Sequence, residues 1–230
     1  MLGDFLELSL TTLDMLASLD FYRKLGFQEA PVGGGWRHPY AVMTDGRLYL
    51  GLHKREPQVP ALSFVLPELR HKLADFEALG IEFSHVNIEP HRFNHFGFAD
   101  PDGGQLTLLE ARTYSPVHGS DLAPSLCGYF TEYRLPVLDV AMSARFWESL
   151  GLIVETAADG EYAQASWGGI NLGLERARPR ARPALVFENP DLEQATALLG
   201  MRGLPLRRDG AGLHVATPEG IELLLREDAT

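Results

Sequence analysis

Two glutamates occupy the same place in two similar stretches of the sequence, 125 residues apart. Glu7 and Glu132 each lie in a first strand, on the side that we expect to face a cavity. A carboxylate at such a place must be solvated, paired or hydrogen-bonded. It could fix a cationic or hydrogen-donating ligand, or act as a general base. The alternative is a structural role with an arginine partner or backbone hydrogen bonds, and the sequence leaves both roles open.

These glutamates belong to a repeat that spans the chain. Shifting the sequence by 125 residues aligns 5–27 with 130–152, and nine of those 23 positions are identical. Chance alone would give about one or two identities. Further matches join 48–52 to 170–174, 60–64 to 183–187 and 100–103 to 217–220. The repeat predicts two tandem domains, at 1–112 and 128–230, joined by a linker at 113–127.

Each domain divides again into two copies of a smaller unit, because the same order of elements recurs within it. The first copy is expected to contain a strand at 5–10, a helix at 14–25, and strands at 27–31, 40–44 and 47–53. The equivalent helices of the other copies are expected at 68–79, at 140–150 and at 191–199. The fold class is therefore α+β: four βαβββ units form two tandem half-open barrels, with helices on the convex faces.

Alternation along the strands assigns side chains to the two faces of these sheets. Leucines mark the helix-packed face of 48–53, so Tyr49 turns to the concave face. A polar concave face is typical of a small-molecule site. We expect the ligand-binding residues to be Glu7, Tyr49, His95, Thr107, Glu132, Asn171 and Glu222.

Particular motifs then resemble a known family. Residues 7–27 and the stretch from Ser143 to Gly151 are similar to the opening motif of the vicinal oxygen chelate superfamily. Asp100-Pro-Asp-Gly103 is similar to its closing motif. That superfamily includes glyoxalase I, fosfomycin-resistance transferases, bleomycin-resistance proteins and extradiol ring-cleaving dioxygenases. The resemblance covers nearly the whole chain, twice, and implies a glyoxalase-, bleomycin-resistance- or dioxygenase-like protein.

The resemblance also implies where a divalent metal would be bound, through His and Glu side chains of the concave face. The three ligand positions fall on Glu7, Ala61 and Thr107 in the first domain and on Glu132, Ala184 and Leu224 in the second. One carboxylate per domain does not hold a catalytic metal, so we expect no metal cofactor. The alternative is a displaced site for Fe, Mn, Ni or Zn formed by Glu132, His214 and Glu222.

The remaining histidines and the single cysteine do not indicate a catalytic or metal-binding arrangement. His91 and His95 are four apart, which on a strand separates them by about 13 Å, too far for one metal. His53 is expected to be solvated at a strand end. Cys127 is expected to be a packing residue, not a nucleophile. No arrangement could be recognised for His38, His71, His85 and His118.

Charge and composition narrow the class of partner. The net charge of −11 argues against a nucleic-acid partner. No apolar run approaches the ~18 residues of a membrane span, and 1–5 lacks the basic residues of a signal peptide. We expect a cytoplasmic protein with a small-molecule ligand, and the resemblance allows a homodimer.

The favoured hypothesis is a two-domain protein that binds a small organic molecule in one or both concave cavities and lacks the superfamily's metal centre. The rival is a metal-dependent lyase or isomerase, or an extradiol-type dioxygenase, with displaced ligands in the C-terminal domain. A third hypothesis is an interaction module whose cavities are filled by side chains. The sequence assigns no catalytic residue.

Overall fold

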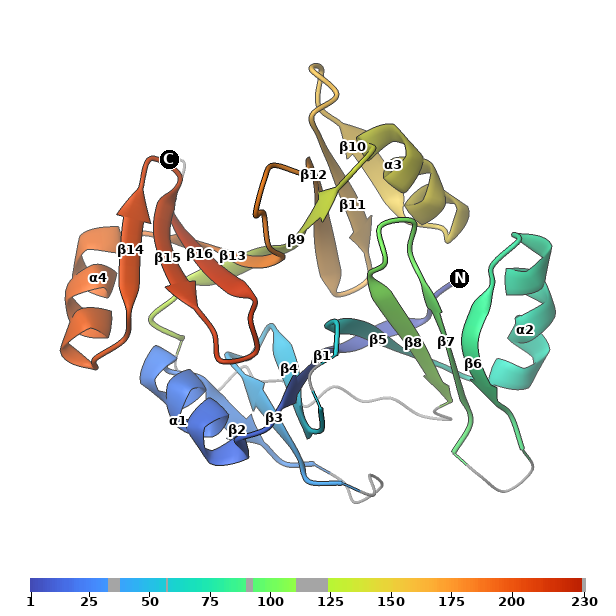
Figure 1. The fold of residues 1–230 in the computed structure, drawn as a ribbon, viewed down its shortest axis with the longest axis horizontal. Helices are drawn as coiled ribbons and strands as arrows, with labels where there is room; N and C mark the ends of the chain where they lie inside the picture. Colours follow the sequence, from blue (N-terminus) through green and yellow to red (C-terminus); the bar gives the residue numbers. More distant parts are fainter. Residues whose placement is uncertain (33–37, 57, 90–92, 111–123, 229–230) are drawn as a thin grey trace. The chain divides into compact units, whose positions relative to one another are not determined.

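Four modules, each of one strand, one helix and three strands, follow one another along the chain (Figure 1). The structure, a computed structural model, describes residues 1–32, 38–56, 58–89, 93–110 and 124–228. The first module contains β1 (Asp4–Thr12), α1 (Met15–Leu25), β2 (Gln28–Ala30), β3 (Tyr40–Thr44) and β4 (Tyr49–Lys54). The second contains β5 (Ala61–Leu66), α2 (Leu69–Ala78), β6 (Phe83–Asn87), β7 (His95–Ala99) and β8 (Gln105–Glu110).

The C-terminal half repeats this order. The third module contains β9 (Tyr129–Val137), α3 (Val140–Ser149), β10 (Ile153–Thr156), β11 (Tyr162–Trp167) and β12 (Ile170–Arg176). The fourth contains β13 (Ala184–Asn189), α4 (Leu192–Met201), β14 (Leu206–Asp209), β15 (Gly212–Ala216) and β16 (Glu222–Glu227). The predicted fold of four βαβββ units is confirmed, with element ends within a few residues of those expected.

Strand order divides the described strands between two eight-stranded sheets. The first runs β2-β3-β4-β1-β5-β8-β7-β6 and the second β10-β11-β12-β9-β13-β16-β15-β14. The two orders are the same when each N-terminal strand is replaced by its C-terminal equivalent. Neither sheet closes on itself, since β2 and β6 end the first and β10 and β14 end the second. The half-open form that the sequence predicts is therefore present.

Three of the four helices in the described residues, α1, α3 and α4, begin at a capping aspartate, whereas Glu68 before α2 makes no such hydrogen bond. Asp14 accepts a hydrogen bond from Ala17 N at 3.1 Å and starts α1. Asp139 caps α3 in the same way, and Asp191 caps α4. A capping side chain satisfies a backbone N–H that the first helical turn leaves without a partner. Gly26, with a φ of 95°, ends α1 in the left-handed conformation that glycine adopts at low cost.

Aromatic packing shows which sheet face the helices cover. The Phe76 ring of α2 lies 5.2 Å from Phe96 and 5.6 Å from Phe98, both on β7. These three side chains are fully buried. In the fourth module, Leu192, Ala195 and Leu199 give α4 its buried side. The apolar parity of each module therefore packs against its helix, and the opposite parity forms a second face.

Contacts group the chain into two compact units, and each unit takes segments from both halves. Unit 1 consists of Met1–Ser9, Val59–Pro116 and Val137–Ala177. Unit 2 consists of Leu10–Gln58, Val117–Pro136 and Arg178–Thr230. The domain boundaries at 112 and 128 stay a prediction, and most of the expected linker lies outside the described residues.

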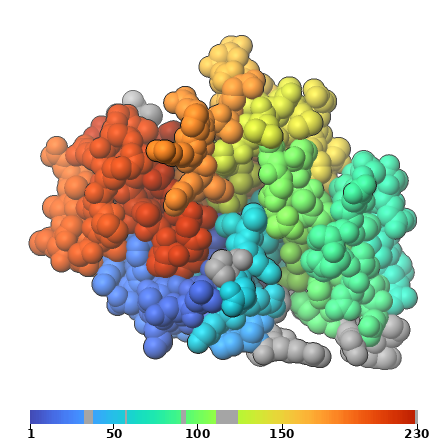
Figure 2. Space-filling view, viewed as in Figure 1, coloured from blue at the N-terminus to red at the C-terminus, as the bar shows by residue number. Residues whose placement is uncertain are grey.

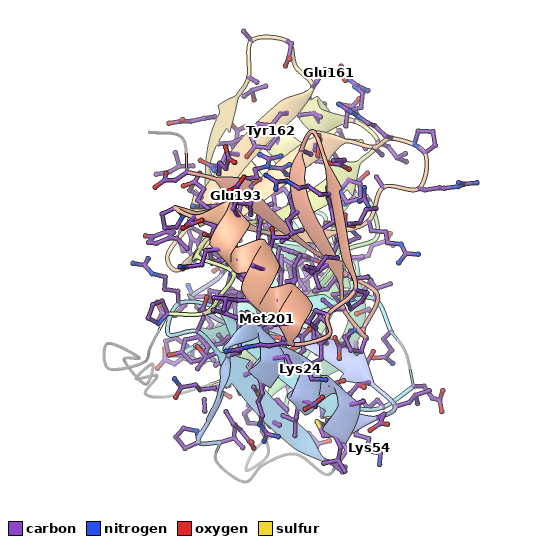
Figure 3. The ribbon with its side chains drawn as sticks, turned by 90° about the vertical axis from the view of Figure 1, so that its left-hand side faces the viewer. Lys24, Lys54, Glu161, Tyr162, Glu193 and Met201 are labelled. Carbon is purple, nitrogen blue, oxygen red and sulfur yellow. The ribbon has the colours of Figure 1, made fainter. Side chains whose placement is uncertain are left out.

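Helix ends within unit 2 are joined directly. Figure 3 shows the end of α1, marked by Lys24, near the end of α4, marked by Met201. Arg202, which follows α4, donates from Nη1 to the carbonyl oxygen of Lys24 at 2.8 Å. A charged donor near the carboxyl end of α1 also complements the partial negative charge of that end.

Candidate functional site

The first polar row crosses unit 1 from β1 to β7. Backbone register places Glu7 beside Ser63, Ser63 beside Thr107, and Thr107 beside Gly97. These positions have the parity opposite to the helix-packed phenylalanines, so they share the second face of the sheet. His95 is two residues before Gly97 and has the same parity. Glu7, His95 and Thr107 are therefore on one face, as the sequence predicts.

The hydroxyl group of Ser9 contacts the carboxylate of Glu7. Ser9 Oγ donates to Glu7 Oε1 at 2.7 Å, and Ser9 Oγ lies 2.8 Å from Ser63 Oγ. A serine has one proton to donate, so Ser63 is the donor in the second bond. The Glu7 side chain is almost completely buried, with 2% of the residue exposed. A hydrogen-bonded chain thus runs from Ser63 through Ser9 to Glu7, and Ser9, which donates to the carboxylate, is neutral.

The equivalent row crosses unit 2 from β9 to β15. Glu132 lies beside Val186, Val186 beside Leu224, and Leu224 beside His214. Two apolar residues therefore stand where the first row has Ser63 and Thr107. Only the two ends of this row carry polar side chains. The sequence predicts Glu132 on this face and the register places it there.

An arginine pairs with Glu132. Arg134 Nε donates to Glu132 Oε1 at 2.8 Å, and Nη2 of the same guanidinium contacts the same oxygen. The side chains are 12% and 5% exposed, so this is a buried ion pair. The structural role left open for Glu132, an arginine partner, is present.

The metal that the fold family implies does not fit these positions. Glu132 is bound by a guanidinium, whose charge opposes a divalent cation at the same oxygen. Ala184 and Leu224, at the second and third positions, have no ligand atom in their side chains. Among the described residues no group of three or more His, Cys, Asp and Glu side chains converges to hold a metal. No step through that metal can be derived from these positions.

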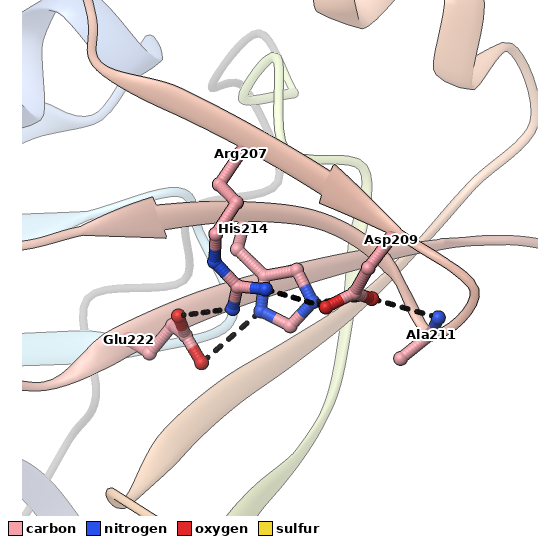
Figure 4. Close-up of polar contacts among 5 residues, drawn as sticks. All are labelled: Arg207, Asp209, Ala211, His214 and Glu222. Atoms are coloured by element: carbon pink, nitrogen blue, oxygen red, sulfur yellow. Dashed lines mark hydrogen bonds and ion pairs between the residues drawn. The ribbon is translucent and has the colours of Figure 1, made fainter.

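A separate charged cluster lies on β14, β15 and β16 (Figure 4). His214 Nε2 is 2.9 Å from Asp209 Oδ1, and His214 Nδ1 is 3.1 Å from Glu222 Oε2. Arg207 bridges the two carboxylates, with Nη1 on Asp209 and Nη2 3.1 Å from Glu222 Oε1. The four side chains therefore form a closed ring of contacts, in which Asp209 and Glu222 each touch both His214 and Arg207.

Burial and charge differ around this ring. The His214 side chain is 9% exposed, whereas the Arg207 side chain is 59% exposed. The strands β14 to β16, drawn in red, reach the surface in Figure 2. The backbone N–H of Ala211, followed by His214 and Arg207, holds the pKa of Asp209 well below its usual range. Asp209 is therefore ionised, and its carboxylate acts only as an acceptor.

The seven predicted ligand-binding residues are divided between the two units. Glu7, His95, Thr107 and Asn171 lie in unit 1, whereas Tyr49, Glu132 and Glu222 lie in unit 2. Of the alternative metal trio, His214 and Glu222 are in contact, and Glu132 is paired along its own strand with Arg134. Whether these residues bind a ligand stays a prediction.

Tyr49 and Asn171 occupy equivalent strands and are both half-buried. Tyr49 on β4 pairs with Thr44, and Asn171 on β12 pairs with Ser166. Burial raises the pKa of the Tyr49 hydroxyl, so it stays protonated and can donate at neutral pH.

Two histidines of unit 1 adjoin the first row. Asn87 Nδ2 lies 3.1 Å from His95 Nε2, and because an amide nitrogen only donates, His95 accepts. The ring of His85 lies 5.1 Å from that of His95, and burial, then His95, lowers the pKa of His85. His85 packs over Gly97, where an added Cβ would lie 2.3 Å from its Cε1. His91 lies outside the described residues.

The first module contains a pair of contacting histidines that could not be recognised from the sequence. His53 was expected to be solvated, but only 5% of it is exposed. His38 Nε2 lies 2.9 Å from His53 Nδ1, and Arg55 Nη2 lies 3.0 Å from His38 Nδ1. The burial of His53 could have been predicted from the hairpin turn at Asp45, because that turn sets the register that pairs Tyr40 with His53.

No protein-family model matches the sequence, and no curated protein matches it. Solved structures do match. Catechol 2,3-dioxygenase is similar with a TM-score of 0.67 and 16% identity, covering 99% of this chain and 88% of that one. Homoprotocatechuate 2,3-dioxygenase from Arthrobacter globiformis has a TM-score of 0.69 and 15% identity, covering 98% and 80%. The Mn(II)-bound glyoxalase from Novosphingobium aromaticivorans has a TM-score of 0.64 and 13% identity, covering 100% and 83%.

The chain therefore has the fold of the vicinal oxygen chelate superfamily, to which these dioxygenases and the glyoxalase belong. The resemblance seen in the sequence motifs is confirmed for the fold, and the chain is glyoxalase- and dioxygenase-like in that sense. Sequence identities of 13% to 16% do not show that this chain has the activity of these proteins. No helix among the described residues has the length and apolar character to cross a membrane.

Proposed function

We propose that this chain binds a small organic ligand against the polar faces of its sheets, without a metal at the superfamily's positions. The observation that carries this proposal is the burial of polar side chains there. Glu7 and Ser63 in one half, and Glu132 and His214 in the other, are each at most 8% exposed. Burying polar groups costs free energy unless they are satisfied. A face that served only to fill a core would carry apolar side chains instead.

In this proposal each unit would hold a ligand with its own residues. In unit 1, Glu7 fixes the polar end of the ligand, and His95, Thr107 and Asn171 offer further hydrogen-bonding groups. In unit 2, Glu132 and Glu222 supply the carboxylates, and Tyr49 contributes an aromatic ring and a hydroxyl donor. A few placed polar groups on a concave face are what a small-molecule site requires.

The ion pair of Glu132 supports this proposal over the enzymatic rival. A lyase, isomerase or ring-cleaving dioxygenase using Glu132, His214 and Glu222 would need the carboxylate of Glu132 as a metal ligand. Arg134 contacts that carboxylate through two nitrogens. A third hypothesis, a pure interaction module, is less consistent with buried carboxylates.

A binding experiment tests the proposal directly. The full chain is treated with EDTA, and catechol, benzoate and benzylamine are titrated by calorimetry. We expect saturable binding of at least one probe in the presence of the chelator. Glu7→Gln or Glu132→Gln should weaken it by about tenfold, the size of one charge-assisted hydrogen bond. Glu161→Gln, at an exposed ion pair with Arg176, is the matched control.

Two outcomes would overturn the proposal. One is the absence of saturable binding for all three probes. The other is binding that disappears with EDTA and returns with a divalent metal, which would favour the enzymatic rival. A cytoplasmic location, a small-molecule partner and a homodimer remain parts of the proposal.

A further inference from the structure

The connection between β12 and β13 has a strongly basic sequence. Residues 176–183 read Arg-Ala-Arg-Pro twice, with four of the chain's 20 basic residues and no acidic residue among them. The chain as a whole has a net charge of −11. The charge of this segment is therefore opposite to that of the rest of the chain, and it attracts negatively charged molecules.

Backbone hydrogen bonds fix the course of this connection. Ala177 N donates to Val137 O at 2.8 Å, and Pro183 O accepts from the first backbone N–H of β16 at 3.0 Å, so both ends are held. Between them, Ala181 N donates to Arg178 O at 2.9 Å and closes a turn. The arginines of this segment are therefore presented from a defined backbone.

Arg180 occupies a position in this turn where glycine is usual. Its φ is 67°, in the left-handed region, and Pro179 precedes it at the position where proline is common in such a turn. In the part of the chain that the structure describes, Glu68 is the other non-glycine residue with a positive φ. An arginine held in this conformation at a cost in free energy indicates a use for its guanidinium.

Three guanidinium groups of this segment find no partner among the described residues. Arg176 is engaged, because its Nε donates to Glu161 Oε1 at 2.8 Å. The side chains of Arg178, Arg180 and Arg182 are exposed and make no hydrogen bond or ion pair with any residue that the structure describes. Exposed arginines elsewhere that pair with a carboxylate of their own chain are Arg23, Arg207 and Arg208. The three charges of the segment are therefore available to another molecule.

We propose that Arg178, Arg180 and Arg182, the arginine loop, form a docking surface for a short acidic peptide segment of another protein. A guanidinium presents parallel N–H donors that match the two oxygens of a carboxylate. Alternate residues carry the three arginines, so carboxylates that are close together in a peptide can each meet one of them. The arginine loop does not depend on the function proposed above.

The charge of the rest of the chain favours a short partner over an extended polyanion. At physiological salt, interactions between exposed charges are screened beyond roughly 8 Å. A few carboxylates on the arginine loop therefore interact with its three charges and little with the acidic surface beyond it. A nucleic acid or an anionic membrane extends further and would also lie against the rest of a chain whose net charge is −11. A second copy of the chain has the same net charge and is repelled in the same way.

Binding of a labelled peptide tests the arginine loop. Fluorescein-labelled hexaglutamate is titrated with the full chain, and its fluorescence anisotropy is followed at about 50 mM and about 150 mM NaCl. We expect saturable binding that is weaker at the higher salt concentration, because salt screens the charges. The loop variant, which combines Arg178→Ala, Arg180→Ala and Arg182→Ala, should bind at least about tenfold more weakly.

A second triple variant is the matched control. It combines Arg70→Ala, Arg145→Ala and Arg208→Ala, three exposed arginines outside the loop. The control lowers the net charge by the same amount as the loop variant, so it measures the effect of net charge alone. It should bind hexaglutamate within about twofold of the natural chain. Circular dichroism checks that both variants are folded.

Arg180→Gly separates binding from folding. Glycine adopts a positive φ at lower cost, so this variant should be at least as stable as the natural chain in urea unfolding. It should nevertheless bind hexaglutamate several-fold more weakly, because one guanidinium is lost. A glycine variant that is less stable and binds as the natural chain does would show that Arg180 serves the turn and not a partner, which contradicts the proposal.

Four other results would overturn the proposal. Two concern the peptide: no saturable binding of hexaglutamate, or equal weakening in the loop variant and the control. The third is tighter binding of labelled hexauridylate or of phosphatidylserine vesicles than of hexaglutamate, because the partner would then be a nucleic acid or a membrane. The fourth is self-association in sedimentation velocity that the loop variant loses, because the partner would then be a second copy of the chain.

Discussion

Ser9 and Arg134 occupy equivalent positions in the two halves, and they treat equivalent carboxylates differently. Ser9 donates one neutral hydrogen bond to Glu7 Oε1 at 2.7 Å. Arg134 contacts Glu132 Oε1 with two nitrogens of a charged group. The strands that carry both pairs, β1 and β9, have the same burial pattern. The residue at this position therefore differs in charge between the halves while the burial of the strand is kept.

The two rows also differ in polarity beyond these carboxylates. In unit 1 the row continues through Ser63 and Thr107, whereas in unit 2 it continues through Val186 and Leu224. At the far end, Gly97 makes room for the ring of a histidine on the neighbouring strand, and its equivalent is His214 itself. Duplication has kept the position of the polar face and redistributed the groups that fill it.

The largest effect is expected from Arg134→Ser, which gives the second half the residue of the first. Glu132 would stay buried, at 4% exposure, without its guanidinium. Removing one partner of a buried ion pair costs about 3–5 kcal/mol. Urea unfolding measures the loss, and the double variant Arg134→Ser with Glu132→Gln should recover most of it. A single variant as stable as the natural chain would contradict the comparison.

The second-largest effect on stability is expected at a position where the two halves have the same residue. Gly3 and Gly128 have φ values of 80° and 93°, and a Cβ would lie 2.1 Å from Val65 O and 2.2 Å from Glu188 O. Alanine at either position combines a left-handed backbone with a clash against a carbonyl. We expect both variants to lose about 2–3 kcal/mol, measured by urea unfolding.

The control is Gly168→Ala, because an added Cβ there meets nothing within 4 Å. A loss at Gly3 without a matching loss at Gly128, or the reverse, would show that the two first strands are not packed alike.

The sequence predicted the fold well because the fold depends on repeated local signals. Asp14 and Asp139 mark helix starts, leucine parity marks the buried face, and the turn at Asp100 marks the last strand of the second module. These signals survive duplication because each is needed for packing. The positions that correspond to the superfamily's metal ligands were inferred from the motifs, and that assignment stays a prediction.

The contacts of the site could be predicted only in part. Parity placed Glu222 on the concave face and suggested His214, but the ring with Arg207 and Asp209 depends on the register of β14 with β15, which no motif sets. His53 was wrongly expected to be solvated, because its burial comes from neighbours on other strands. The sequence repeat gives no sign of the two compact units, because each unit contains segments from both halves of the chain.

A pH effect is expected at the turn where the halves differ again. Burial raises the pKa of Asp100 to about 6, although the backbone N–H groups of Gly104 and Asp102 oppose this. The repeat places Thr217 at the equivalent turn. A carboxyl with a raised folded pKa binds more protons in the native state, so the contribution of Asp100 to stability is fully present below about pH 4 and is lost as pH rises through about 6. Asp100→Asn should remove this fall, which is about 1–3 kcal/mol.

Urea unfolding at pH 4, 5, 6 and 7 checks this prediction. The asparagine keeps the side-chain oxygen that accepts from Gly104 N at 2.7 Å, so the turn itself should persist. If the natural chain and the variant showed the same dependence of unfolding free energy on pH, the buried carboxyl would not be its source.

The smallest effect is expected from Ser9→Ala, which tests the comparison of Ser9 with Arg134 in the N-terminal half. Ser9→Ala removes the hydroxyl that donates to Glu7 and accepts from Ser63, but it removes no charge. A neutral hydrogen bond contributes about 0.5–1.5 kcal/mol, and the loss should stay near that range. Because Arg134→Ser removes a buried charge at the equivalent position, the two variants should differ by at least about 2 kcal/mol. Equal losses would mean that Arg134 acts on Glu132 only as a hydrogen-bond donor, and its charge would then have no part in setting what the second half can bind.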